Sequence, residues 1–163
     1  MFSKKDEGTR KAELVEYTID SLVNVFSFQL GDYIASSKLS KLLYLVMKNI
    51  LDTNRENSFE LITTAVDTII DNYNKSDKAK DLEHNVLISH PSGHRLVKSL
   101  ISGYQKYAGE AKEFYDELIE KIFEFAIKEL AILLQTKAIF VIIALIENTD
   151  YKDQVNYSRL SFI

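Results

Sequence analysis

The sequence predicts an all-α protein. One proline and five glycines among 163 residues are too few for the many turns of a β-sandwich or barrel. Apolar residues instead recur at intervals of three and four along most of the chain, which is the spacing of one helix face. Because 46% of the residues are hydrophobic, a chain of this length can bury one sizeable core, and we expect a single domain over residues 1–163.

Composition restricts the classes of protein that fit. The sequence has no cysteine, which excludes disulfides and thiolate zinc sites. The N-terminus, "MFSKKDEGTRK", lacks the apolar stretch of a signal peptide, so we expect a cytosolic or nuclear protein. A net charge of -4 and a pI near 5.4 argue against broad, charge-driven binding of nucleic acid. Any basic surface must therefore be local.

The first helix is predicted by one apolar stripe. After an expected cap at Thr9, the residues Val15, Ile19, Leu22 and Phe26 follow at spacings of four, three and four. This pattern is typical of an amphipathic helix that packs on a partner.

Two further helices are expected before the middle of the chain. Residues 33–51, "YIASSKLSKLLYLVMKNIL", carry apolar side chains on most faces, so we expect this helix to be buried on most sides. Asn57 followed by Glu60 resembles a capping box, and it predicts a third helix that runs to about Asn74. Residues 75–88 are charged and are predicted to form a mobile surface loop.

Helical periodicity returns in the second half. Pro91 suits the first turn of a helix, where its missing N–H costs nothing. Phe114, Leu118, Ile122 and Phe125 then predict an amphipathic helix, whose acidic residues would form a solvated face, and "AIKELAILLQT" predicts a short helix after it. The nine consecutive apolar residues from Ala138 to Ile146 are too few for a membrane span of about 20, so we expect a fully buried helix there.

Self-comparison predicts a repeated unit. The segments 42–51, 92–101 and 137–146 align with Val46, Leu96 and Val141 in register, and the offsets are 50 and 45 residues. Unequal but similar offsets are expected where insertions fall in loops between repeats. The approximate repeats are 10–54, 57–107 and 110–150, although any three apolar helices can be slid into register by chance.

Four segments together resemble a known family. "KKDEGTRKAELVEYTIDSLV", "LSKLLYLVMKNIL", "HPSGHRLVKSLI" and "FYDELIEKIFEFAIKELAILLQTKAIFVIIALIENTD" are similar, in order and spacing, to the C-terminal region (CPL domain) of the Puf-A class of pumilio-repeat proteins. The resemblance covers about residues 4 to 155, and its most specific part is His90 to Ile101. It implies a right-handed superhelical α-solenoid of about three pumilio-like repeats.

The same resemblance implies a function. It predicts a protein of the nucleus and nucleolus that binds structured or double-stranded RNA with little sequence specificity. The role would be large ribosomal subunit assembly and rRNA processing, or mRNA regulation, with pre-ribosomal proteins as further partners. It implies no catalytic residues and no cofactor.

Base-by-base reading of RNA is not expected. Sequence-reading pumilio repeats place an amide or acidic residue beside a stacking residue on each inner helix, so that one repeat reads one base. None of the three aligned helices carries such an amide at the corresponding positions. If RNA binds, we expect phosphate contacts and limited stacking. The candidate residues are Lys41, Tyr44, Lys48, His94, Arg95, Lys98 and Lys137.

The string "HPSGH" admits three interpretations. His90 and His94 are four residues apart, as in some zinc sites, with His84 as a weak third ligand and no carboxylate at ligand spacing. Ser92, Gly93 and His94 are candidates to line a phosphate cradle at the helix start. Alternatively, Gly93 permits close packing against the preceding helix while the imidazoles close the repeat boundary.

Two functions of different class stay open. The sequence contains no cysteine nucleophile, no glycine-rich phosphate loop of standard pattern and no Gly-x-Ser-x-Gly elbow, so we do not expect an enzyme. The first function is RNA binding by a helical-repeat surface. The second is a protein–protein interaction module without direct RNA contact, in which the acidic residues between Glu113 and Glu124 attract a basic partner.

Overall fold

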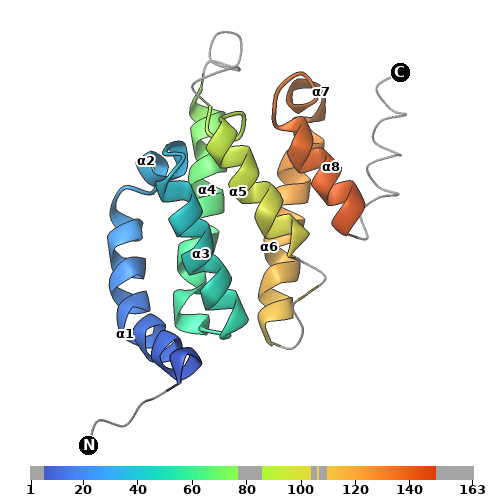
Figure 1. Cartoon of the computed structure of the whole chain (residues 1–163). Helices are drawn as coiled ribbons and strands as arrows, with labels where there is room; N and C mark the ends of the chain where they lie inside the picture. Colours follow the sequence, from blue (N-terminus) through green and yellow to red (C-terminus); the bar gives the residue numbers. More distant parts are fainter. Residues whose placement is uncertain (1–5, 77–85, 104–105, 107–109, 150–163) are drawn as a thin grey trace, which may run out of the picture.

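The fold of this protein is all-α. The computed structural model describes residues 6–76, 86–103, 106 and 110–149, and in that part it contains helices and no strands (Figure 1). None of the helices described there has both the length and the apolar character needed to cross a membrane. The elements are α1 (Glu7–Phe28), α2 (Leu30–Ala35), α3 (Leu39–Asp52), the 3-10 turn η1 (Glu56–Ser58), α4 (Phe59–Lys75), α5 (Pro91–Ser102), α6 (Glu110–Lys128), α7 (Leu130–Leu133) and α8 (Ile139–Asn148).

The longer helices form two rows (Figure 1). The front row consists of α3, α5 and α8, in which α5 packs on α3 at one side and most extensively on α8 at the other. The back row consists of α4 and α6, which contact each other behind it. Helix α1 lies at the N-terminal end of both rows and contacts α3 and α4. Helix α5 is therefore flanked by α3 and α8 with the back row behind it, and among the described residues no helix lies in front of this row (Figure 1).

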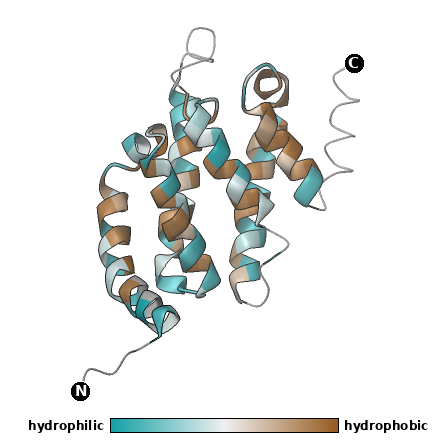
Figure 2. Ribbon diagram, in the orientation of Figure 1, coloured by the Kyte–Doolittle hydropathy of each residue, from teal (hydrophilic) through white to brown (hydrophobic). Residues whose placement is uncertain are grey.

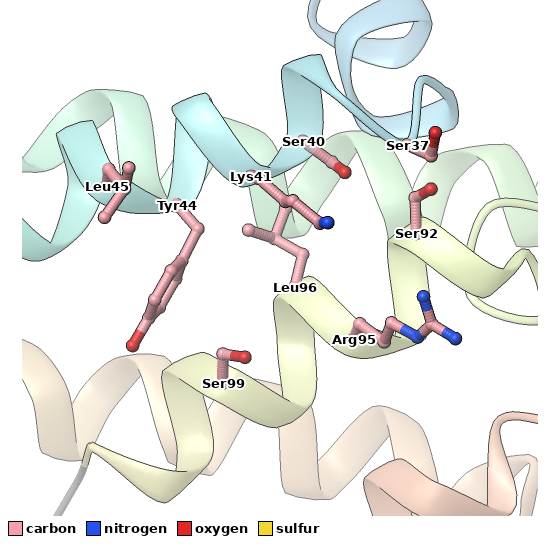
Figure 3. A pocket seen from close by; sticks show the side chains of 9 residues that line it. All are labelled: Ser37, Ser40, Lys41, Tyr44, Leu45, Ser92, Arg95, Leu96 and Ser99. Atoms are coloured by element: carbon pink, nitrogen blue, oxygen red, sulfur yellow. The ribbon is translucent and has the colours of Figure 1, made fainter.

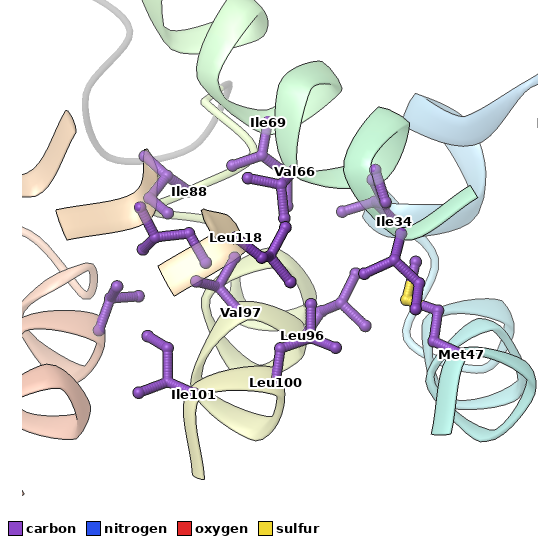
Figure 4. Packing of buried hydrophobic residues seen from close by; sticks show 14 of the residues in the cluster. Ile34, Met47, Val66, Ile69, Ile88, Leu96, Val97, Leu100, Ile101 and Leu118 are labelled. Carbon is purple, nitrogen blue, oxygen red and sulfur yellow. The ribbon is translucent and has the colours of Figure 1, made fainter. Parts of the chain in front are cut away.

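The core is centred on α5. Its apolar side chains meet residues from the helices on either side and from both rows (Figure 4). Near α5, Met47 comes from α3, Val66 from α4 and Leu118 from α6, and all are buried. The cluster extends along the rows as one continuous core, because each helix buries an apolar stripe against its neighbours.

The register predicted for the three apolar segments agrees with the burial pattern. Equivalent positions are buried in all three front-row helices, since they turn the same face toward the back row. The three sets are Val46, Leu96 and Val141; Met47, Val97 and Ile142; and Ile50, Leu100 and Leu145.

Two front-row helices are less buried than we predicted. Residues 33–51 are divided between α2 and α3, and the Ser36 hydroxyl accepts a hydrogen bond from the backbone N–H of Leu39 at the division. Leu45 on α3 and Phe140 on α8 are 59% and 44% exposed, although Figure 2 shows apolar residues along most of α8. The predictions of a helix buried on most sides at 33–51 and of a fully buried helix at 138–146 were both wrong, because among the described residues no layer covers the front row.

Two predicted caps were also wrong. Helix α1 is capped by Asp6, whose carboxylate accepts a hydrogen bond from the N–H of Thr9 at 3.0 Å. Asn57 and Glu60 form no capping box, because residues Glu56–Ser58 make a 3-10 turn and α4 begins at Phe59 without a side-chain cap.

The expected loop at 75–88 is shorter than we predicted. Lys75 is the last residue of α4, and Val86 and Ile88 are buried in the core. The backbone N–H of Leu87 donates to the side-chain oxygen of Asn72 at 2.8 Å, which fixes the chain against α4 just before α5. The central part of the expected loop, residues 77–85, lies outside the described residues.

Candidate nucleic-acid interface

Helix α3 places three of the predicted residues on one face. Lys41, Tyr44 and Lys48 are spaced by three and four residues, so they follow one another along the helix. Lys41 is exposed, and the ring of Tyr44 is partly buried against the core. This face is the solvent side of the front row.

Lys48 is neutralised by its neighbours. Its ammonium lies 2.6 Å from the carboxylate of Asp52, which also accepts from Lys106 at 3.1 Å. The hydrogen bond and charge of Asp52 raise the pKa of Lys48. A lysine that is already paired gains less from a phosphate than a free lysine does. Lys48 is therefore the weakest of the predicted cations.

Helix α5 presents Arg95 and Lys98 to solvent. The helix begins as the sequence predicted, with Pro91 in its first turn and His90 as the N-cap residue. Arg95 and Lys98 are both exposed. Neither makes an ion pair with a carboxylate anywhere in the described part of the chain. They are exposed cations on the front row.

His94 does not lie on this surface. Its side chain is only 6% exposed. Its Nδ1 lies 3.0 Å from the carbonyl oxygen of His90, and its ring faces that of Phe140 at 5.6 Å between centroids. Burial lowers the pKa of His94, as do the nearby charges of Arg95 and Lys137, while the His90 carbonyl opposes them. The prediction that His94 stacks on RNA was wrong, because the ring fills the α5–α8 contact.

Helix α8 contributes an aromatic ring that we did not predict. Phe140 is 44% exposed, and the ammonium of Lys98 lies 5.9 Å from the centroid of its ring, within the range of a cation–π contact. Lys137, just before α8, is exposed and near enough to affect the pKa of His94. Arg95, Lys98 and Lys137 therefore lie together where α5 meets α8.

A pocket of about 320 Å³ opens between α3 and α5. Figure 3 shows side chains of both helices around it, with Lys41 and Tyr44 on one side and Arg95 on the other. The sequence-based prediction did not include the serines that line this pocket. Helical spacing could have placed two of them beside Arg95, since Ser92 lies three residues before it and Ser99 four residues after it. The lining residues are Ser37, Ser40, Lys41, Tyr44, Leu45, Ser92, Arg95, Leu96 and Ser99.

The start of α5 is not the phosphate cradle that we considered. The N–H of Ser92 donates to Nδ1 of His90 at 3.2 Å, and the N–H of His94 donates to the His90 carbonyl at 3.1 Å. Gly93 lies against the Leu87 carbonyl, where a Cβ would come within 1.8 Å of the oxygen. The packing interpretation of Gly93 was therefore correct in kind, but its neighbour is the turn before α5 rather than the preceding helix.

No metal site was found near the two histidines. Groups of three or more His, Cys, Asp or Glu side chains that could hold a metal ion do not occur among the described residues. His84, the third ligand considered, lies outside them. The imidazoles of His90 and His94 are instead engaged with backbone groups of α5.

Charge is unevenly distributed between the rows. The helices of the front row contain four Lys or Arg and two Asp or Glu, whereas those of the back row contain four Lys or Arg and nine Asp or Glu. Three of the back-row cations pair with neighbouring carboxylates, among them Lys112 with Asp116 at 2.9 Å and Lys121 with Asp67. The predicted acidic face of α6 is solvated, since Glu113, Glu117, Glu120 and Glu124 are exposed. A protein of net charge -4 thus keeps a local basic surface.

Comparison with known proteins identifies the family. The family model of the CPL (NUC119) domain matches residues 1–113. The chain belongs to the CPL (NUC119) domain family. Searches of curated proteins and of solved structures gave no significant match.

The CPL match includes most of the candidate interface. Helices α1 to α5, the α3–α5 pocket and six of the seven predicted residues lie within residues 1–113 of the CPL region. Only Lys137 lies beyond it, together with Phe140 of α8. The α3–α5 pocket is therefore a feature of the CPL region itself, and α8 extends the front row past it.

Proposed function

We propose that this CPL-domain protein binds structured or double-stranded RNA through the front row, with little sequence specificity. In this proposal, residues 10–54, 57–107 and 110–150 are three repeats of a right-handed α-solenoid, and the front row is its inner face. The protein would act in the nucleolus, in large ribosomal subunit assembly and rRNA processing or in mRNA regulation, with pre-ribosomal proteins as further partners. It would act by binding and not by catalysis.

One observation carries the proposal. Lys41, Arg95, Lys98 and Lys137 are exposed on or beside the front row, and within the described residues none of them pairs with a carboxylate. Unpaired cations along one surface bind phosphates and release the counterions that surround them. The back-row cations are mostly paired, so the same number of positive charges there offers much less attraction.

The chemistry of the surface supports low sequence specificity. Amide and carboxylate side chains at fixed positions read the edges of adenine and cytosine. The exposed front of α3, α5 and α8 instead presents cations, hydroxyls and apolar side chains, including Leu45, Arg95 and Phe140 at equivalent register positions. Such groups contact phosphates and ring faces, which all nucleotides share.

The surface also supports binding rather than catalysis. The lining of the α3–α5 pocket contains no aspartate, glutamate, histidine or cysteine. Aspartate, glutamate and histidine are the usual general acids and bases at neutral pH, and a serine nucleophile is normally activated by such a base beside it. Lysine, arginine, tyrosine and serine side chains in that arrangement are suited to holding an anion.

Charge reversal tests the proposal. We expect Arg95→Glu with Lys98→Glu to abolish binding of a fluorescein-labelled RNA duplex in an anisotropy titration at about 50 mM salt. The matched control is Lys75→Glu with Lys128→Glu, which makes the same change of net charge on exposed residues of the back row and should weaken binding only slightly. Equal loss in both double variants, or no binding by the wild-type protein, would contradict the proposal.

A second function is favoured by the acidic back row. The exposed glutamates of α6 would attract a basic partner protein, and the protein would then be an interaction module that does not touch RNA. Capture of a basic pre-ribosomal protein that is unchanged by Arg95→Glu with Lys98→Glu, but lost with Glu117→Lys and Glu120→Lys, would support this alternative. Localisation of a fluorescent fusion in the nucleolus is expected under both.

A further inference from the structure

We propose that the α3–α5 pocket holds one unpaired nucleotide of the bound RNA, with its base beside Tyr44 and its phosphate between Lys41 and Arg95. This inference rests on the proposed RNA binding and names the kind of RNA that suits the surface. It predicts a preference for duplexes interrupted by a bulged or splayed-out nucleotide over fully paired duplexes.

Two largely buried serines line the pocket, and their hydroxyls have no protein partner among the described residues. Ser40 and Ser92 are 6% and 5% exposed, and both line the pocket from opposite helices (Figure 3). Neither hydroxyl has a hydrogen-bond partner in the described part of the chain. Because both serines line the pocket, their hydroxyls are placed to receive hydrogen bonds from, or donate them to, a ligand.

The charged side chains of the pocket select an anion. Lys41 and Arg95 reach it from α3 and α5, and neither has a carboxylate partner among the described residues. A guanidinium, an ammonium and nearby hydroxyls together form the short, charge-assisted hydrogen bonds that phosphate oxygens accept. The lining holds no carboxylate that would repel the phosphate.

The remaining wall is apolar and suits a base. Tyr44, Leu45 and Leu96 line the pocket beside the serines, and Figure 3 shows the Tyr44 ring extended from α3 toward Ser99 of α5. The volume of about 320 Å³ is at the small end of the range for small-molecule sites. A stacked duplex is far too wide for it. Only a base splayed out of its helix can enter and lie against an aromatic ring.

The test compares two RNA duplexes that differ by one nucleotide. The first contains a single bulged 2-aminopurine, a fluorescent adenine analogue, and the second is fully paired. We expect tighter binding of the bulged duplex and quenching of its fluorescence, because the analogue would stack on Tyr44. Tyr44→Leu should remove the quenching and reduce the affinity for the bulged duplex by roughly 5- to 150-fold, which is the range for loss of one base–aromatic stack. Tyr44→Phe keeps the ring and should retain both effects.

A second variant separates loss of the binding pocket from loss of the fold. Ser99→Leu adds bulk at the half-buried edge of the pocket without touching the core, and it should also abolish the preference for the bulged duplex. Thermal unfolding followed by circular dichroism shows which variants are folded.

The outcomes separate this inference from the proposed function. Equal affinity of the wild-type protein for both duplexes, with no quenching, overturns the pocket assignment and leaves RNA binding intact. Absence of binding to either duplex overturns both. Retention of the bulge preference in folded Tyr44→Leu or Ser99→Leu also overturns the assignment, because the nucleotide would then lie elsewhere.

Discussion

At the scale of single residues, two side-by-side residues in the first turn of α5 pack this helix against its neighbours. Gly93 and His94 are both buried there, one against the Leu87 carbonyl and the other against Phe140. The sequence marked this string as unusual but allowed a metal, an anion or a packing role. Only the neighbours in space distinguish these roles, because a histidine has the same spacing to its neighbours along the chain whether its ring is exposed or buried.

Replacement of Gly93 should destabilise the protein. In Gly93→Ala the new Cβ would lie 1.8 Å from the Leu87 carbonyl oxygen, and backbone must move to relieve the clash, at about 1–3 kcal/mol. Urea denaturation measures the free energy of unfolding. Gly31→Ala is the matched control, since its nearest contact would be an ordinary 3.8 Å from Thr68. It should be neutral or stabilising. A Gly93→Ala variant as stable as the control would contradict the packing role.

Protonation of His94 should destabilise the fold. Its pKa is lowered by burial, then by the nearby positive charges of Arg95 and Lys137, whereas the unfolded chain titrates near 6.5. Between the two values the unfolded state binds more protons, so the free energy of unfolding falls as the pH falls below about 6.5. Urea denaturation at pH 8, 6.5 and 5 should show this decline. The slope should be smaller in His94→Gln, and an unchanged slope would mean that other groups cause it.

At the scale of helices, the spacing of apolar residues along the chain predicted where helices lie better than it predicted where they begin and end. The 3.6-residue period of the apolar residues placed most of the longer helices, including the start of α5 at Pro91. Helix ends were less predictable, because Asp6, Thr9 and Asn57 are all residues of the capping type and only backbone geometry selects among them. Exposed apolar residues on α1, such as Tyr17 and Phe28, were missed because their spacing resembles that of a buried face.

A buried hydrogen bond connects α4 to the junction of α6 and α7. The hydroxyl of Tyr73 donates to the carboxylate of Glu129 at 2.8 Å, and burial and this carboxylate raise the pKa of Tyr73. Tyr73→Phe should lower the free energy of unfolding by about 1–3 kcal/mol, since it removes a partner from a buried carboxylate. Glu129→Gln keeps an acceptor and should cost less. A double-mutant cycle of the two changes in urea would give no coupling if the hydrogen bond did not contribute.

At the scale of the whole molecule, the distribution of charge matters more than its sum. The net charge of -4 argues against nucleic-acid binding, yet most of the excess carboxylates lie in the back row. The sequence identified the cations of the front row as a group. Their separation from the acids could not be predicted, because neighbouring helices in the chain alternate between the two rows.

Salt dependence should report the number of free cations. With Lys41, Arg95, Lys98 and Lys137 in contact with phosphates, a plot of log affinity against log salt should have a slope of magnitude about 3 to 4 for an RNA duplex. Lys98→Ala should reduce it by about 1. Lys48→Ala should change it much less, because Asp52 already holds that ammonium at 2.6 Å. A slope of zero would rule out phosphate contacts, and equal effects of the two variants would contradict the role of Asp52.

The sequence by itself determined the all-α class, the approximate positions of most of the longer helices and the common register of α3, α5 and α8, since each follows from apolar spacing within one segment. It also marked the cations of the front row. The pairing of Lys48 with Asp52 was also open to the sequence, because the two residues lie four apart on one helix. Only the tertiary structure decided that His94 is buried and that Ser40 and Ser92 meet across a pocket. These two features depend on distances between helices, which no periodicity along the chain encodes.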